Sequence, residues 1–219
     1  MLDLLSMVAA RLGEIIIKSN LEDEVKVLKE ASKLMSSNTF LTISRVFSFR
    51  DPYTVIHQNL VTKVALELAV KLKFSNEEVH DVPIASMLHD IGKIGIPMET
   101  LSRLCRLSSE EFELIKSHAR IGANIVEDLP SSQNVKLMVL EHHERLDGSG
   151  YPDQKKGDQI YIGSQLIAVA DAACAMLENR PYRSAMKIGE VKDELLINSK
   201  NKYNQVIVGH LIEILDQIY

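Results

Sequence analysis

The chain has 219 residues, of which 46% are hydrophobic and 25% are charged, a composition typical of a soluble globular protein. Its formal net charge of −5 argues against a protein that coats a nucleic acid polymer, although local cations can still hold a small anionic ligand. Two cysteines, Cys105 and Cys174, are too few for a disulfide framework and favour a reducing, cytoplasmic environment. The sequence contains no uncharged run long enough to span a membrane and no signal-peptide pattern.

Residues 1–48 carry apolar side chains at every third or fourth position, which predicts two amphipathic helices. The two apolar stripes consist of Leu5, Val8, Leu12 and Ile15, and of Leu21, Val25, Leu28 and Met35. These apolar stripes must be buried, either against the remainder of the chain or against the same helices of a second chain. Because two-fold pairing is the commonest form of oligomer, we expect a homodimer through these helices. Residues 1–48 are therefore interpreted as a helical linker or dimerisation segment, and residues 49–219 as the domain that carries the chemistry.

Almost every later segment carries a helix signal. Asp51 is a natural N-cap, and two serine–glutamate capping boxes follow, Ser75 with Glu78 and Ser108 with Glu111. Helices are predicted over residues 51–73, 75–90, 108–127, 132–145 and 164–178, with two more within 186–218. The one long irregular segment is rich in glycine and contains a weak strand signal, QIYIG. The expected fold is therefore all-α.

Five of the seven histidines have suggestive placements, each on or at the end of a predicted helix, and carboxylates accompany some of them. They are His57, His89, His118, His142 and His143. Asp90 follows His89 directly, and Asp171 lies in the apolar stretch AVADAACAM, where a charge is costly unless a partner or a metal offsets it. Imidazole and carboxylate together suit Fe, Mn, Zn or Ni, and a pattern without thiolates excludes a zinc finger. Each residue taken alone is more often structural, which is the interpretation given to His80 and His210.

Two segments, HDIGKIGIP (residues 89–97) and HHERLDGSGYP (residues 142–152), resemble the signature motifs of the HD-GYP family, a branch of the HD metal-dependent phosphohydrolases. IKSHARIGANI lies between them, and AVAD and RPYR lie after them, where the family has related segments. The resemblance covers the chain from about Asp51 to about Leu215. It implies an HD-type helical bundle, here with an N-terminal helical extension, that hydrolyses cyclic di-GMP, a bacterial second messenger.

The resemblance also implies a binuclear metal site. One metal would be held by His57, His89, Asp90 and Asp171, and the second by His118, His142 and His143, with Asp90 bridging both. We expect the two divalent ions to be Fe or Mn. A glutamate that holds a third metal in some members is replaced by Tyr53, whose phenol, with a pKa of about 10, is a poor substitute.

The resemblance further implies roles for residues around the metals. Two metals would bridge a hydroxide that attacks phosphorus, giving the linear dinucleotide, GMP or both. Lys93, beside the catalytic Asp90, would contact the scissile phosphate or the leaving oxygen. Arg180 and Arg183 would grip phosphate, and Tyr151 would meet a base or a phosphate. The family's GYP loop is also linked to partner proteins. A solvated or purely structural role stays open for each of these residues.

The sequence departs from the family pattern at several positions outside the predicted ligands. A second aspartate is Cys174, an arginine is Gln165, the residues GL after the GYP motif are Gln154 and Lys155, and the residues FDP are Tyr203, Asn204 and Gln205. These changes leave open a catalytically weak signalling module that binds cyclic di-GMP or a partner protein. An HD hydrolase of another nucleotide is disfavoured by the GYP motif.

Overall fold

The computed structural model of the chain describes Arg11, Thr42 and residues 52–103, 107–129, 132–179 and 184–218. The chain divides into two units, and every element named below belongs to the second, Ser44–Tyr219. The helices expected in residues 1–48 fall almost wholly outside the described residues, so their dimer stays a prediction. Within the described ranges the secondary structure is helical and without strands, which confirms the all-α fold. No helix in these ranges combines the length and hydropathy needed to cross a bilayer.

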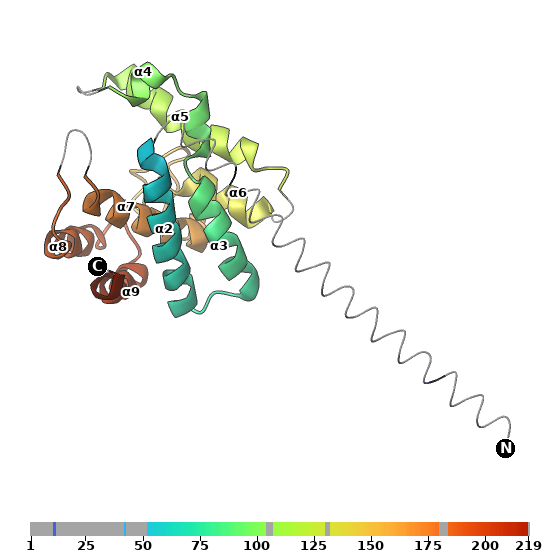
Figure 1. Cartoon of the computed structure of the whole chain (residues 1–219), viewed down its shortest axis with the longest axis vertical. Coiled ribbons are helices and arrows are strands. Elements are labelled where there is room, and N and C mark those ends of the chain that lie inside the picture. Colours follow the sequence, from blue (N-terminus) through green and yellow to red (C-terminus); the bar gives the residue numbers. More distant parts are fainter. Residues whose placement is uncertain are drawn as a thin grey trace. The chain divides into compact units, whose positions relative to one another are not determined.

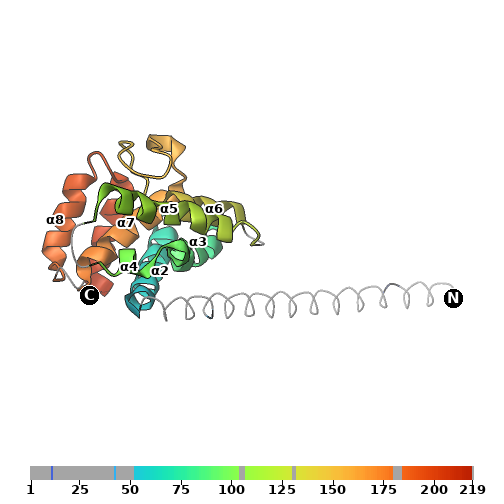
Figure 2. The same cartoon turned by 90° about the horizontal axis from the view of Figure 1, so that it is seen from above.

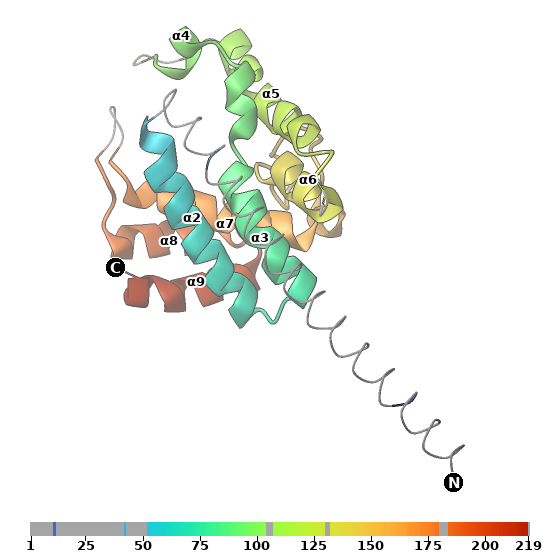
Figure 3. The ribbon, with the colours of Figure 1, turned by 45° about the vertical axis from the view of Figure 1, so that its right-hand side comes forward.

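The domain is a helical bundle in which helices α2 (Pro52–Lys71) and α7 (Ile162–Leu177) each pack on several others. The other α-helices are α3 (Asn76–Leu88), α4 (Met98–Leu101), α5 (Ser109–Ile125), α6 (Ser132–Glu141), α8 (Ile188–Asn198) and α9 (Gln205–Ile218). Two short 3₁₀ helices are η1 (Ile91–Gly95) and η2 (Gly157–Gln159). Helix α2 runs beside α3 and packs on α7 and α9 (Figures 1 and 3). Helices α5 and α6 lie together (Figure 2), α5 on η1 and α6 on α3 and α7.

The buried face of α2 shows why these helices assemble. Val61, Val64 and Leu68 follow one another at helical spacing and are fully buried. The helices packed on α2 also carry fully buried apolar side chains, among them Leu166 of α7 and Leu211 of α9. At about 25 cal/mol per Å² of apolar surface removed from water, such side chains are the main source of stability.

Both capping boxes form as the sequence predicts. The Glu78 backbone N–H donates to Ser75 Oγ at 3.3 Å while Glu78 Oε2 accepts from the Ser75 backbone N–H at 2.9 Å. The same exchange joins Ser108 and Glu111 at the start of α5. Each box supplies partners for backbone N–H groups that the first turn of a helix leaves unpaired.

The helix ends next to the histidines differ from the prediction. Helix α6 ends at Glu141 rather than at residue 145, because the Glu144 N–H donates to the Glu141 carbonyl at 2.7 Å in a tight turn. Helix α3 ends at Leu88 rather than at residue 90, and the unpredicted 3₁₀ helix η1 follows. The QIYIG segment forms no strand, since η2 and the first turn of α7 take up most of it. These ends place the paired histidines and Asp90 on turns instead of helix faces.

Candidate metal centre

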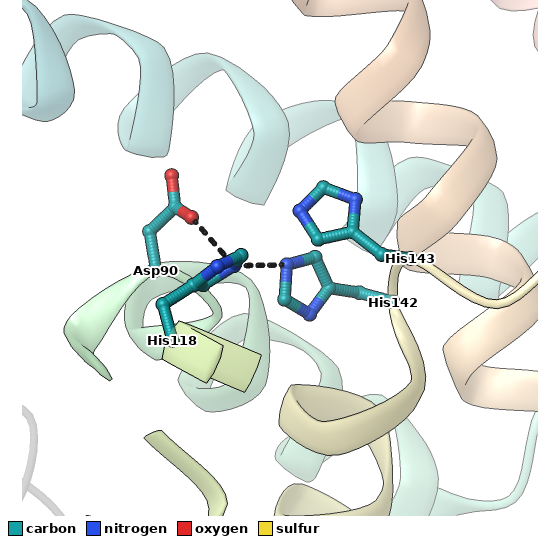
Figure 4. A group of neighbouring side chains, drawn as sticks. All are labelled: Asp90, His118, His142 and His143. Carbon is teal, nitrogen blue, oxygen red and sulfur yellow. Dashed lines mark hydrogen bonds and ion pairs between the residues drawn. The ribbon is translucent and has the colours of Figure 1, made fainter. Parts of the chain in front are cut away.

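Histidines and an aspartate from four parts of the chain meet in one buried cluster. The potential ligand atoms of Asp90, His118, His142 and His143 all lie within 4.8 Å of one another, and so do those of His57, His89 and Asp90. Figure 4 shows Asp90 and His118 facing the histidine pair. Asp90 belongs to both groups, as the sequence analysis expected of a bridging residue. All six side chains are buried except that of His143, which is half-buried.

Asp171 stands at the edge of this cluster. It projects from α7 so that its Oδ1 lies 2.9 Å from His57 Nε2 and 4.0 Å from His89 Nε2. It is not within 4.8 Å of every other ligand atom of either group. All seven predicted ligand side chains are thus close together, with Asp171 on the His57 side.

Three of the histidines are oriented by a backbone carbonyl about one turn earlier in the chain. In each, Nδ1–H donates to the backbone carbonyl three residues earlier: His89 to Ser86 at 2.7 Å, His118 to Ile115 at 2.7 Å and His142 to Val139 at 2.8 Å. A neutral imidazole carries only one N–H, so these bonds leave Nε2 of each ring as a lone pair. This pattern, in which a second hydrogen bond fixes the ligating nitrogen, is usual for histidines that bind metals.

The lone pairs then point at one another. Nε2 of His118 lies 3.3 Å from Nε2 of His142, although neither nitrogen has a proton to share in these tautomers. Nε2 of His89 is buried and makes no hydrogen bond. Convergent acceptors without donors are unfavourable in a buried site unless a cation lies among them. The donor set, nitrogen and carboxylate oxygen without thiolate, fits divalent transition metals.

Electrostatics keep the ligands in the states that bind metals. Burial lowers the pKa of His143 to about 3 and that of His142 well below its usual range, so both rings stay neutral near pH 7. Burial alone would raise the pKa of Asp90, but the Lys93 ammonium beside it holds that pKa well below the ordinary value. Neutral imidazole and ionised carboxylate are the forms that coordinate metal ions.

His57 differs from the other histidines in this respect. Burial lowers its pKa, but hydrogen bonds to Asp171 and Glu178 outweigh burial and raise the pKa to about 10. Without a metal, His57 is therefore protonated between two carboxylates. A metal ion bound at Nε2 would displace that proton, so binding on this side of the cluster competes with protons.

Two of the predicted substrate contacts border the cluster. Lys93 Nζ lies 2.6 Å from Asp90 Oδ2, and the lysine side chain is 26% exposed. The Tyr151 ring lies against the His143 ring, with centroids 4.6 Å apart. Lys116, which the sequence analysis did not single out, has its Nζ 5.7 Å from the Tyr151 ring centroid. Arg180 and Arg183 lie outside the described residues.

A family comparison decides the classification. The sequence model of the HD domain family matches residues 25–207, more than half of the chain. This chain belongs to the HD domain family. The classification, with relatives named as cyclic dinucleotide phosphodiesterases, confirms the resemblance drawn from the two motifs. The matched range includes every residue of the histidine and aspartate cluster described above.

Individual relatives match part of their own length. The chain is 39% identical over 152 residues to “Cyclic di-GMP phosphodiesterase response regulator RpfG” of Xanthomonas campestris, which covers 67% of this chain and 39% of that protein. It is 33% identical over 144 residues to “3′3′-cGAMP-specific phosphodiesterase 3” of Vibrio cholerae, and this alignment covers 66% of this chain and 31% of that protein. The chain thus spans less than half the length of either relative.

A solved structure supports the same fold. An HDG“Y”P protein of Bdellovibrio bacteriovorus superposes on this HD domain with a TM-score of 0.61 at 24% identity. The match covers 73% of this chain and 51% of that one.

Two carboxylates that the sequence analysis missed hold the GYP loop of this HD domain. Glu141 accepts from Lys155 Nζ at 2.6 Å and from the Tyr161 N–H at 2.9 Å. Glu144 accepts from the backbone N–H groups of Asp153 at 2.7 Å and of Lys155 at 3.1 Å. Both carboxylates are almost fully buried and flank the histidine pair, so the EHHE pattern was the available signal. They connect the loop that displays Tyr151 to the turn that carries the ligands.

Two departures from the HD-GYP pattern prove to be partners. Asn204 Nδ2 donates to Gln165 Oε1 at 2.9 Å and joins the start of α9 to α7. Lys155, a third departure, anchors the GYP loop through its backbone and its side chain. Cys174 is fully buried in α7, where burial raises the pKa of its thiol. These residues are therefore accommodated by local contacts.

Proposed function

We propose that this HD domain is a metal-dependent phosphodiesterase that hydrolyses cyclic di-GMP to the linear dinucleotide, GMP or both. The observation that carries the proposal is the convergence of unprotonated Nε2 atoms on Asp90, an arrangement that calls for cations. The name of the Xanthomonas campestris relative supports the substrate. Phosphodiester hydrolysis is the chemistry for which paired divalent ions are suited.

The ligands divide into two sets that share one carboxylate. The proposed assignment gives one ion to His57, His89, Asp90 and Asp171, and the other to Asp90, His118, His142 and His143. Nitrogen and oxygen donors without thiolate suit Fe, Mn, Zn or Ni, and among these the resemblance to the HD-GYP family favours Fe or Mn. When bound, such a pair of ions lowers the pKa of water and draws negative charge away from a phosphoryl group.

The residues around the ligands position and polarise the substrate. Lys93 brings a positive charge to Asp90 Oδ2 and, when the metals occupy that carboxylate, can turn to the scissile phosphate or the leaving oxygen. Burial raises the pKa of Tyr151, so its phenol stays protonated and donates a hydrogen bond to a base or a phosphate. Arg180 and Arg183 complete the proposal as phosphate-binding residues.

Two alternatives follow from particular observations. The departures at Cys174, Gln165 and Asn204 favour a catalytically weak signalling module that binds cyclic di-GMP or a partner protein. The name of the Vibrio cholerae relative favours a different cyclic dinucleotide, 3′3′-cGAMP. The proposal also includes a cytoplasmic location, a homodimer through residues 1–48 and contact of partner proteins with the GYP loop.

The purified chain is expected to contain about two Fe or Mn ions per protomer and to hydrolyse cyclic di-GMP, because its donors divide into two sets. Elemental analysis after anaerobic purification gives the metal content, and chromatography of reactions with cyclic di-GMP and 3′3′-cGAMP gives the products. A reproducible content near one ion contradicts the binuclear site. Binding of cyclic di-GMP without products supports the signalling module, and faster hydrolysis of 3′3′-cGAMP assigns the domain to that substrate.

Arg183→Ala is expected to lower kcat/KM about ten- to a hundredfold without changing the metal content, because a charge-assisted hydrogen bond contributes roughly 1.5–3 kcal/mol. Steady-state kinetics and elemental analysis measure the two quantities. Lys71→Ala is the control, since Lys71 pairs with Glu213 on the surface at 2.9 Å. Unchanged kinetics in Arg183→Ala would return this arginine to the solvated surface.

A further inference from the structure

His57 is held differently from His89, His118 and His142. Those three rings donate Nδ1–H to a carbonyl three residues earlier in the chain. His57 lies within α2, and its Nδ1 instead lies 2.9 Å from Glu178 Oε2, a residue 121 positions away. The orientation of this one ring therefore depends on a side chain from another helix.

Helix α7 and the residue directly after it supply the two partners of the His57 ring. Asp171 of α7 lies at Nε2, and Glu178, the C-cap residue that follows Leu177, lies at Nδ1, each at 2.9 Å. The backbone of Glu178 is extended (φ −99°, ψ 144°), so its carboxylate reaches the ring from the end of α7 and not from a helical turn. The three side chains are mostly buried, with exposed fractions of 8% for His57, 14% for Asp171 and 21% for Glu178.

Other residues of α7 offer no equivalent acceptor. Cys174, one turn before Glu178, is fully buried and provides only a thiol, a weak acceptor. Glu178 bonds Nδ1 of the His57 ring, whereas the opposite nitrogen, Nε2, faces Asp171. A carboxylate in that place supports a ligand from behind and does not enter the cluster.

We propose that Glu178 is a positioning residue for the metal centre: its carboxylate accepts the His57 Nδ1–H and thereby aims Nε2 at the ion shared with Asp171. The inference rests on the metal site of the proposed function and adds a residue to it. A carboxylate behind a ligating imidazole fixes the tautomer and the ring direction and makes the nitrogen a stronger donor. Glu178 does this through a contact between α2 and α7.

The test compares Glu178→Ala with Glu178→Gln in the full chain, measuring Mn²⁺ stoichiometry and affinity by chelator competition. Glu178→Ala is expected to weaken one of the two sites about ten- to a hundredfold, the usual effect of losing such a partner. Glu178→Gln is expected to stay within a few-fold of wild type, because its amide oxygen still accepts the Nδ1–H. Glu213→Ala is the control, since Glu213 also lies beside a histidine, His210 at 3.5 Å, but on the exposed surface.

A second measurement detects the hydrogen bond between His57 and Glu178 and needs neither bound metal nor enzyme activity. In the metal-free protein, the His57 Nδ1–H proton resonance is expected to appear downfield in wild type and Glu178→Gln, and to be lost in Glu178→Ala. Unchanged Mn²⁺ affinity in Glu178→Ala would overturn the proposal. Equal losses in both variants would also overturn it, because they would make Glu178 a charged ligand. A wild-type chain that binds two ions but leaves cyclic di-GMP intact refutes the phosphodiesterase and leaves the role of Glu178 standing.

Discussion

Replacing Asp90 with alanine is expected to remove both metal ions and to lower cyclic di-GMP hydrolysis by more than about a hundredfold. Asp90 is common to both groups of potential ligands, with Oδ1 3.4 Å from His118 Nε2 and Oδ2 3.4 Å from His89 Nε2. Loss of a residue that merely supports a ligand already costs about ten- to a hundredfold. The loss of a shared carboxylate should exceed that, and it also leaves Lys93 without its partner at 2.6 Å. Elemental analysis and kinetics of the variant measure both effects.

Two controls separate this effect from the general cost of losing a carboxylate. Asp171→Ala is expected to weaken only the site on the His57 side, because Asp171 lies 2.9 Å from His57 and outside both groups of potential ligands. Asp81→Ala removes a buried aspartate that bonds Asn134 at 3.2 Å, away from the cluster. It is expected to lower the free energy of unfolding by about 1–3 kcal/mol while keeping both ions. Two ions retained by Asp90→Ala would show that Asp90 does not bridge them.

Features set by neighbours in sequence were predictable. The two capping boxes fixed the starts of α3 and α5, because the partners lie only three residues apart. Helix ends were less accessible. Helix α3 stops before His89 and is followed by η1, which packs on α5, a contact that no local pattern records. The seven predicted ligands came from the family resemblance, and spacing alone gave no reason for them to meet.

Partners distant in sequence were missed for the same reason. Glu178 looks like an ordinary helix-end glutamate until α7 packs on α2 and brings it to His57. In the sequence, Gln165 and Asn204 are two separate departures from the HD-GYP pattern. In the structure they are hydrogen-bonded to each other, although they lie 39 residues apart in the sequence. A departure from a family pattern can be judged only when the residue facing it is known.

Gly92→Ala is expected to disrupt the metal centre without replacing a proposed ligand. A Cβ on Gly92 would lie 1.9 Å from the His118 carbonyl oxygen and 2.4 Å from the Gly122 backbone nitrogen. Both atoms belong to the backbone of α5, so no side chain can turn aside. To admit the methyl group, η1 and α5 must separate, and this moves Asp90 away from His118, 3.4 Å from it in the wild type. Overpacking costs about 1–3 kcal/mol, which corresponds to a fall of about 2–12 °C in Tm.

Gly95→Ala is the matched variant, because both glycines lie in η1 and neither has a positive φ. A Cβ on Gly95 meets the tip of the Ile121 side chain at 3.0 Å, and that side chain can shift by a few tenths of an ångström. Gly95→Ala should therefore keep both ions and nearly the wild-type Tm, whereas Gly92→Ala should bind at least one ion about tenfold more weakly. Metal titration and thermal unfolding of the two variants test this. Equal behaviour of the pair would mean that the close approach of η1 to α5 does not set the distance between Asp90 and His118, and that the ligands find their places by contacts elsewhere in the bundle.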